Sequence, residues 1–516
     1  MKRAVYPLLL LLVIAVSWYI RSAFVAVPLF RDEGGYGYIA QVIQQGGLLY
    51  RDVVDIKPPG VYYLYWLAQI LFGWGSGPGV RIFASIACLL TIPFIYLLTK
   101  RISSPGAALA AALLFGLITP SPRLMGCLAF CEVFMFLPIV ASFWLFIAAL
   151  DEEGAGSRIL LAIAGFLMGL AFMIKPVALF FLLPPCAYAL LRFQDTNDRR
   201  KLYGAAFFLG GFALSMTLLV LWLVLKGIFT DFYEVNVRFN SIFASSYPDE
   251  MGTTYASRLL RSLKAQIIDN NEMMFLLILS MLYWVLGPKS EKSIRITLVL
   301  WCLTAYAGVC MSGRFYLHYY LLMIPALAIS SALAFHHAAQ KAPQMARLFL
   351  LFISLVFLIY YGGYLSPFLF SNTPADTAQS MFHADNNIYA QKLADYIRAR
   401  TSDSDRIFVW GMEFQVYFYA RRLCATRHLC LYNIIVLAAS REPAARELLR
   451  QYQDETIADF KRTPPRYFIV TLPNLSMKYQ TEEVYLTTFA DRMLKEGYAQ
   501  ETVIGPYTVF AMKKKP

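Results

Sequence analysis

Long apolar runs alternate with short polar segments over the first 366 residues of the chain. Most of these runs contain about the ~20 apolar residues that an α-helix needs to cross the ~30 Å hydrocarbon core of a bilayer. The pattern predicts about eleven membrane-spanning helices, at residues 5–22, 80–99, 106–120, 130–150, 158–174, 176–192, 204–226, 272–288, 297–312, 316–335 and 347–366.

Three polar regions lie between or after these runs, at residues 23–79, about 227–271 and 370–516. In the last region, helix-like and strand-like runs alternate, at Asn387–Arg400, Arg406–Trp410, Ala444–Tyr452, Tyr467–Thr471 and Tyr507–Met512. Such alternation over a region of this length is typical of a small α/β domain. We therefore expect a membrane domain over residues 1–369 and a soluble α/β domain over residues 370–516.

Positive charges are placed unevenly around the predicted spans. They gather at alternate span ends, as Lys2, Arg3, Lys100, Arg101, Arg192, Arg199, Arg200, Lys201, Lys289, Lys292, Arg295, Lys341 and Arg347. Loops rich in Lys and Arg stay in the cytoplasm. We therefore expect a cytoplasmic N-terminus and, after an odd number of spans, an extracytoplasmic C-terminal domain on the cytoplasmic (inner) membrane. The first run has no clear signal-peptide cleavage site, so we interpret it as an uncleaved helix.

Composition agrees with a membrane protein. Hydrophobic residues make up 58% of the chain and charged residues only 15%, whereas a soluble domain has about 25% charged residues. The formal charge of +13 fits cytoplasmic anchoring, attraction to anionic lipid phosphates, or both. No dense basic run occurs, which argues against nucleic-acid binding. Of the eight cysteines, Cys424 and Cys430 lie in a polar segment and could form a disulfide, but their spacing does not require one.

The first outer region, 23–79, carries the main candidate chemistry. The adjacent carboxylates Asp32 and Glu33 follow the first span directly, where they must be solvated, paired or functional. Further on, Asp55 precedes Lys57-Pro58-Pro59, and Val61–Phe72 forms an aromatic run too short to span. We expect two surface helices that frame a polar junction, with Lys57 at the height of lipid phosphates. Ordinary solvated loop charges are the simpler alternative for the acidic pair.

Two more candidates lie at the outer ends of the fourth and fifth spans. Glu132 is a lone carboxylate among Phe, Met and Leu, and such a group either reaches water or faces a functional cavity. Arg123, in the preceding loop, could pair with Glu132 or bind phosphate. Lys175 ends a glycine-rich span before Pro176, where it either snorkels to the interface or faces the cavity.

Arg314 opens the tenth span on the predicted outer side, where a positive charge runs against the orientation bias. The planar guanidinium group of Arg314 can donate two parallel hydrogen bonds to a phosphate group. We expect His318 one turn later on the same helix face, and we place His318 and Tyr319 in the substrate cavity. Arg238, in a predicted surface helix of the second outer region, could bind phosphate or simply belong to a solvated face.

These motifs resemble the GT-C superfamily of glycosyltransferases, and within it the branch of protein O-mannosyltransferases and aminoarabinose transferases. The resemblance extends over residues 1–366. It rests on Asp32-Glu33 after the first helix, on Lys57-Pro58-Pro59 at the start of a second surface helix, and on the polar C-terminal domain. It implies a GT-C fold and a polyprenyl-phosphate sugar donor. In the family the acidic pair, Asp32 with Glu33, holds the general base, taken here as Asp32, and Lys57 contacts the donor phosphate.

Tyr36 keeps the family pattern, whereas two positions depart from the aminoarabinose transferases. Ile56 replaces a Glu that helps to hold a metal, and Gly35 replaces an Arg. The resemblance therefore does not extend to the aminoarabinose donor or to a fixed set of metal ligands. It leaves a divalent metal open, with Asp32, Asp55, Glu132 and His318 as candidate ligands, and implies no other cofactor.

The expected function is the inverting transfer of a sugar to a hydroxyl of a lipid, glycan or protein acceptor at the outer face of the membrane. The absence of a nucleotide-binding glycine motif argues against a nucleotide-sugar donor. The alternative is a lipid or glycan transporter or flippase without covalent chemistry. Such proteins have internal repeats and charges near the bilayer midplane, whereas the candidate charges here lie at the outer ends of the spans.

Overall fold

The structure is a computed structural model of the chain. It describes residues 2–246, 253–341, 343–382, 386–429, 431–471 and 484–513. Contacts divide the chain into two compact units. Unit 1 comprises Met1–Val25, Arg81–Val220 and Thr254–Thr373, and unit 2 comprises Ala26–Val80, Leu221–Thr253 and Pro374–Pro516. A single boundary between residues 369 and 370 would leave the first two outer regions with the membrane helices, whereas this division groups most of them with the C-terminal region. That predicted boundary stays a prediction.

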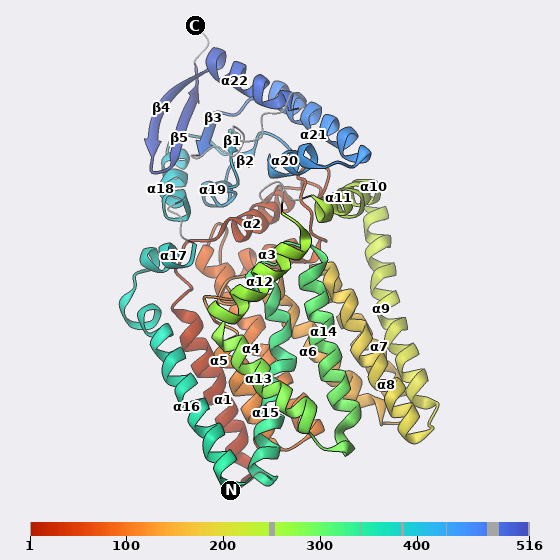
Figure 1. Cartoon of the computed structure of the whole chain (residues 1–516). Helices are drawn as coiled ribbons and strands as arrows, with labels where there is room; N and C mark the ends of the chain where they lie inside the picture. Colours follow the sequence, from red (N-terminus) through yellow and green to blue (C-terminus); the bar gives the residue numbers. More distant parts are fainter. Residues whose placement is uncertain are drawn as a thin grey trace. The chain divides into compact units, whose positions relative to one another are not determined.

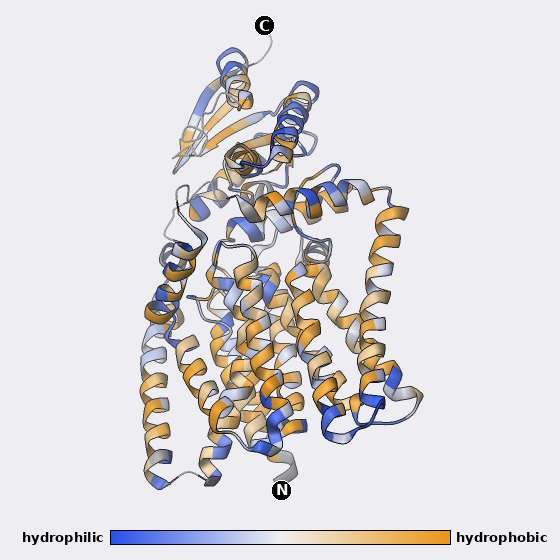
Figure 2. Ribbon diagram, turned by 45° about the vertical axis from the view of Figure 1, so that its right-hand side comes forward, coloured by the Kyte–Doolittle hydropathy of each residue, from blue (hydrophilic) through white to orange (hydrophobic). Residues whose placement is uncertain are grey.

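Unit 1 is a bundle of apolar helices (Figures 1 and 2). The helices that lie wholly or mainly in it are α1 (Lys2–Ser22), α4 (Gly77–Ile102), α5 (Pro105–Ile118), α6 (Cys131–Leu150), α7 (Ala155–Ile174), η1 (Pro176–Leu182), α8 (Leu183–Thr196), α9 (Arg200–Leu225), α12 (Tyr255–Asp269), α13 (Asn271–Leu286), η4 (Lys289–Glu291), α14 (Lys292–Met311), η5 (Leu317–Met323), α15 (Ile324–Lys341), α16 (Gln344–Ser366) and η6 (Pro367–Ser371).

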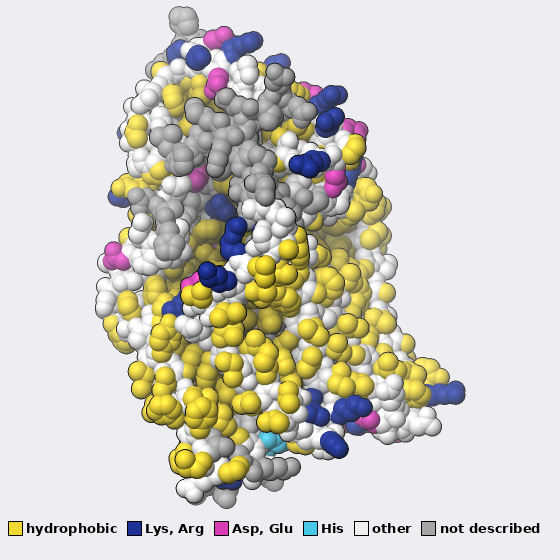
Figure 3. Space-filling view, viewed as in Figure 1, with side chains coloured by type: hydrophobic (Ala, Val, Ile, Leu, Met, Phe, Trp, Pro, Cys, Tyr) yellow, Lys and Arg dark blue, Asp and Glu magenta, His cyan; other side chains and the backbone are white. Residues whose placement is uncertain are grey.

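In the part of the chain that the structure describes, nine helices are long and apolar enough to cross a membrane. They coincide with nine of the predicted spans, while residues 106–120 and 272–288 fall on α5 and α13, of 14 and 16 residues. The α9 and α16 spans are only 28% and 17% buried despite hydropathies of 2.3 and 2.2. Their hydrophobic side chains therefore need lipid around them, and such side chains cover the helices of unit 1 in Figure 3. The chain is a multi-pass membrane protein.

Ion pairs gather at one end of unit 1. Arg101 at the end of α4 pairs with Glu152, and Lys201 at the start of α9 pairs with Asp151 at 2.8 Å. His337 near the end of α15 lies 3.0 Å from Glu291. These residues come from loops and helix ends that the charge pattern assigns to the cytoplasm. The fold thus brings the predicted cytoplasmic loops together at one end of the bundle.

Unit 2 combines the first outer region with the second and with the C-terminal region. Its helices are α2 (Arg31–Gln44), α3 (Gly60–Phe72), α10 (Phe229–Tyr233), η2 (Glu234–Phe239), α11 (Asn240–Ser245), α17 (Pro374–Phe382), α18 (Asn386–Arg398), α19 (Gln415–Ala420), α20 (Leu431–Ala439), α21 (Pro443–Arg462) and α22 (Tyr485–Gly497). The two predicted helices that frame residues 45–59 are present as α2 and α3. Cys424 is buried, and its suggested partner Cys430 lies outside the described residues.

A five-stranded sheet forms the core of the C-terminal region. Its strands are β1 (Arg406–Trp410), β2 (Leu423–Cys424), β3 (Tyr467–Thr471), β4 (Tyr498–Ile504) and β5 (Tyr507–Met512), in the order β2-β1-β3-β5-β4. β1 pairs in parallel with β2 and β3, which requires helical crossovers, and β5 pairs antiparallel with β3 and β4. The predicted small α/β domain is confirmed, and β1, β3 and β5 have the predicted bounds.

Within unit 2, helix α2 packs against α19 at backbone distance. A Cβ atom on Gly34 would lie 2.3 Å from the Cα of Gln415, and one on Gly37 would lie 2.5 Å from the Phe418 ring. The Leu29 N–H donates to the Tyr419 hydroxyl at 2.9 Å, which fixes the chain just before α2. The glycines of the Glu33-Gly34-Gly35-Tyr36-Gly37 segment therefore hold α2 on the C-terminal region.

We expect Gly34→Ala to destabilise unit 2 by ~1–3 kcal/mol, because its Cβ must push the Gln415 backbone away. Gly497→Ala, at the end of α22, is the matched control, since a Cβ there has no atom within 4 Å. Thermal unfolding in detergent, followed by circular dichroism, measures both variants. Equal melting temperatures for the two variants would contradict this packing.

Candidate functional site

The acidic pair lies in the first turn of α2. Asp32 is in a loose ion pair with Arg31 at 3.7 Å, and its side chain is 37% exposed. Glu33 is buried and accepts a hydrogen bond from the Phe30 N–H at 2.8 Å. Asp32 is thus accessible to a ligand, whereas Glu33 stabilises the start of α2, and its predicted catalytic role stays a prediction.

The Tyr62 hydroxyl organises the loop between α2 and α3. It donates to Asp55 Oδ2 at 2.8 Å and accepts the Lys57 N–H at 3.2 Å. Asp55 Oδ1 accepts the Ile56 N–H at 2.7 Å, and the Tyr50 hydroxyl donates to the Lys57 carbonyl at 2.9 Å. Lys57 is therefore held in a fixed backbone conformation directly after Asp55. Neither tyrosine is recognisable as a site residue from the sequence, because aromatic residues are common in interfacial helices such as α3 and in the turns beside them.

Asp55 couples this loop to the start of α2. Burial raises the pKa of the Asp55 carboxyl, and the charge of Asp32 raises it further, while Lys57 and the hydrogen bonds oppose the increase. Asp32 and Lys57 thus both lie within electrostatic reach of Asp55. The fold of unit 2 thus brings these three charged groups of the first outer region close enough to influence one another.

Other residues of unit 2 support this loop. The buried Tyr36 ring packs edge-on against Tyr65, with the centroids 5.5 Å apart. Asn240 Nδ2 donates to the Ile56 carbonyl at 2.9 Å. Arg238 is engaged by Glu234 at 2.9 Å and by Glu447 in α21. These contacts give Arg238 a structural role between two segments of unit 2, and phosphate binding by it stays a prediction.

A second polar cluster lies inside unit 1. Lys175 forms an ion pair with Glu132, and both residues are buried. The Lys175 ammonium also lies 3.5 Å from the centroid of the Tyr319 ring. His318 is in electrostatic reach of the Glu132 carboxylate. Four residues predicted for the phosphate-binding and cavity roles are therefore neighbours.

Arg123 has a different partner from the one considered in the sequence analysis. It pairs at 3.3 Å with Glu272, whose side chain is fully buried, and its guanidinium lies 3.7 Å from the Tyr364 ring centroid. Ser121 also donates to Glu272. The sequence analysis missed Glu272, although a lone carboxylate at the start of an apolar run is the same signal that selected Glu132.

The expectation that Arg314 and His318 share a helix face is wrong. Arg314 lies in an irregular segment, and the helix begins only at Leu317. Gly313 and Phe315 have φ values of +61° and +52°, and this left-handed backbone interrupts the helix. His318 instead stacks on Phe130, with ring centroids 4.3 Å apart.

The candidate metal ligands do not form a set. Asp32 and Asp55 interact within unit 2, while in unit 1 the Glu132 carboxylate is occupied by Lys175. Among the described residues, no group of three or more His, Cys, Asp or Glu side chains could hold a metal ion. We therefore assign no metal-dependent step to these residues.

Part of the chain matches a known protein family. The family described as dolichyl-phosphate-mannose-protein mannosyltransferase matches residues 56–226. This segment begins at the Lys57 loop and continues through Glu132 and Lys175. No curated protein sequence matches the chain.

Solved structures match almost the whole chain. ArnT from Cupriavidus metallidurans in the apo state has 14% identity and a TM-score of 0.63, over 99% of this chain and 98% of that one. The same protein bound to undecaprenyl phosphate matches with a TM-score of 0.62. The archaeal oligosaccharyltransferase AglB from Archaeoglobus fulgidus, in complex with an inhibitory peptide and a dolichol-phosphate, has 14% identity and a TM-score of 0.56, over 99% of this chain and 75% of that one. The expected fold is confirmed.

The raised pKa of Asp55 predicts a pH dependence of stability. A carboxyl whose pKa is raised in the folded state stabilises the fold below its ordinary value of 3.8, and this contribution is lost as the pH rises through the folded value. We expect Asp55→Asn to lose less stability than the wild type between about pH 4 and pH 7. Thermal unfolding in detergent across this range tests it, with the exposed Asp491→Asn as control. Parallel curves for Asp55→Asn and wild type would refute the expectation.

Removing one partner of the buried Lys175–Glu132 ion pair in unit 1 should lower the free energy of unfolding. We expect Lys175→Met to destabilise the protein by ~3–5 kcal/mol, because Glu132 is then buried without its cation. The double variant Lys175→Met/Glu132→Gln should recover most of that loss. Unfolding by titration with sodium dodecyl sulfate measures it, and the exposed Lys226→Met is the control. If the double variant is less stable than Lys175→Met, the pair does not stabilise the bundle in this way.

Proposed function

This chain has the GT-C fold of membrane glycosyltransferases, and we propose that it transfers a sugar from a polyprenyl-phosphate donor to a hydroxyl acceptor. The observation that carries the proposal is the loop in which the Tyr62 hydroxyl hydrogen-bonds both the Asp55 carboxylate and the Lys57 N–H, with Asp32 within electrostatic reach of Asp55. The match to a dolichyl-phosphate-mannose-protein mannosyltransferase family supports it, since that match includes the Lys57 loop.

In this mechanism Asp32 is the general base. Its carboxylate is accessible, lies in the first turn of α2 and forms a loose ion pair with Arg31 at 3.7 Å. The acceptor hydroxyl gives its proton to Asp32 as its oxygen bonds to the anomeric carbon. The bond from that carbon to the donor phosphate oxygen breaks, and the electron pair leaves with the phosphate. One displacement of this kind inverts the anomeric centre.

The leaving phosphate needs positive charge that is already in place. Lys57 supplies it, because the Tyr62 and Tyr50 hydroxyls fix the backbone of its loop. We further propose that Arg314 and Lys175 of unit 1 bind phosphate, and Lys175 is paired with Glu132 there. Tyr319 and His318 lie beside this pair and are proposed to contact the substrate.

We place the reaction at the outer face of the cytoplasmic membrane, with the N-terminus in the cytoplasm. The gathering of cationic loops at one end of unit 1 supports this orientation, through ion pairs such as Lys201 with Asp151. The acceptor is a lipid, a glycan or a protein that presents a hydroxyl group.

The test is turnover by membranes that carry the chain and its native acceptors, supplied with labelled polyprenyl-phosphate sugars. We expect Asp32→Asn to lower the rate of label transfer by ~10²–10⁴-fold, because the hydroxyl loses its base. Asp491→Asn, an exposed carboxylate of α22, should transfer label at the wild-type rate. Wild-type turnover by Asp32→Asn would remove Asp32 as the base, and no transfer by the wild type from any such donor would remove the transferase proposal.

A further inference from the structure

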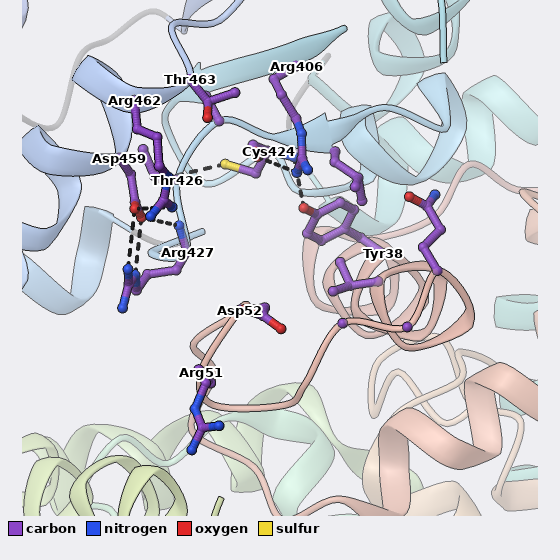
Figure 4. Close-up of a pocket in the computed structure, with 16 residues that line it drawn as sticks. Tyr38, Arg51, Asp52, Arg406, Cys424, Thr426, Arg427, Asp459, Arg462 and Thr463 are labelled. Carbon is purple, nitrogen blue, oxygen red and sulfur yellow. Dashed lines mark hydrogen bonds and ion pairs between the residues drawn. The ribbon is translucent and has the colours of Figure 1, made fainter. Parts of the chain in front are cut away.

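A separate pocket lies in unit 2, at the other end of α2 from Asp32 (Figure 4). Its lining comes from the second half of α2 and the loop after it, and from the C-terminal region. The lining residues include Tyr38, Gln45, Arg51, Asp52, Arg406, Thr426, Arg427, Asp459, Arg462 and Thr463. Along the axis of α2, Tyr38 and Gln45 lie ~9 and ~20 Å from Asp32. The pocket is therefore distinct from the place where the proposed reaction occurs.

The pocket is positively charged. Four arginines and two aspartates line it. Arg51 is paired with Asp231 at 2.7 Å, so the remaining arginines, Arg406, Arg427 and Arg462, exceed the two aspartates by one charge. Asp459 is buried and accepts hydrogen bonds from Arg427 Nε at 3.2 Å and from Arg462 Nη2 at 2.7 Å, so one carboxylate holds two guanidinium groups. Arg406 Nη1 donates to the Cys424 carbonyl at 3.2 Å. These bonds use only part of the five N–H donors of each guanidinium, which leaves the rest for an anion.

The size and the other lining groups favour a sugar over a bare ion. The pocket has a volume of about 470 Å³, and sites of ~300–1,000 Å³ hold small organic molecules. Tyr38, Thr426 and Thr463 contribute hydroxyl groups to the lining. The Tyr38 hydroxyl accepts the Cys424 N–H at 2.8 Å and the Thr426 hydroxyl donates to the His428 carbonyl at 3.0 Å, so each keeps part of its hydrogen-bonding capacity for a ligand. A Cβ atom on Gly46 would meet no atom within 4 Å, which leaves space at that side. Hydroxyls together with guanidinium groups match a saccharide that carries a phosphate or carboxylate.

The pocket is also connected to the proposed reaction site through one loop. The Arg427 carbonyl accepts the Val54 N–H at 2.9 Å, and Val54 directly precedes Asp55. Asp52, in the same loop, lines the pocket and accepts the Leu48 N–H at 2.7 Å. A ligand in the pocket thus contacts the loop that carries Asp55 and Lys57.

We propose that this pocket binds an acidic saccharide unit of the acceptor, at a distance from the hydroxyl that receives the sugar. This assignment rests on the proposed transferase function, which gives the chain an acceptor. Arg406, Arg427 and Arg462 bind the anionic group, and the hydroxyl groups bind the sugar ring. The pocket then selects acidic glycans or glycolipids among hydroxyl-bearing molecules.

The experiment measures binding by the full chain in lipid nanodiscs by calorimetric titration. The probes are glucose 6-phosphate, glucose, inorganic phosphate and a hexaglutamate peptide. We expect glucose 6-phosphate to bind at least tenfold more tightly than each of the other three, and its affinity to fall with added salt. Binding of glucose 6-phosphate no tighter than inorganic phosphate would overturn the saccharide assignment, and equal binding of hexaglutamate would favour a peptide partner instead.

Variants locate the site. Arg406→Gln/Arg462→Gln should lower the affinity for glucose 6-phosphate at least tenfold, while Arg450→Gln, an exposed arginine of the same helix as Arg462, should not change it. Circular dichroism melting checks that each variant is folded. Unchanged affinity in the folded double variant would overturn the proposal. Asp32→Asn should bind glucose 6-phosphate like the wild type, so that failure of the pocket and failure of the transferase mechanism give different results.

Discussion

The close packing of α2 on α19 is the constraint on which the rest of unit 2 depends. Gly34 and Gly37 leave no room for a side chain between the two helices. Because α2 is fixed in this way, its first turn presents Asp32 next to the Asp55 loop, and its second half lines the arginine pocket. One rigid helix therefore serves two sites, and the first outer region and the C-terminal region form one compact unit.

Buried charges in unit 1 follow a different rule. An apolar bundle tolerates an ionised group only if a partner of opposite charge or several hydrogen bonds accompany it. Glu132 is paired with Lys175, and Glu272 is paired with Arg123 and hydrogen-bonded by Ser121. The stability of the bundle therefore depends on these contacts, because removing one partner leaves the other charge buried without compensation.

Much of the fold could be predicted because strong local signals specify it. Nine of the predicted spans are helices long enough to cross a membrane, and β1, β3 and β5 have their predicted bounds. The signals failed where tertiary contacts decide the local structure. Strand β4 is an edge strand with mostly exposed side chains and no clear alternation, and Arg314 lies outside a helix because Gly313 and Phe315 adopt left-handed backbone.

The sequence by itself determined that this is a membrane protein and selected Asp32, Asp55 and Lys57 as candidate site residues, because hydropathy and the cost of charge near lipid are local properties. Tertiary structure alone decided the partners of these residues. Tyr62 joins Asp55 to Lys57, Arg123 pairs with Glu272, and the arginines of the C-terminal region form a pocket with α2. The hydrophobic periodicity of the sequence does not predict such contacts, because they depend on how distant segments pack in space.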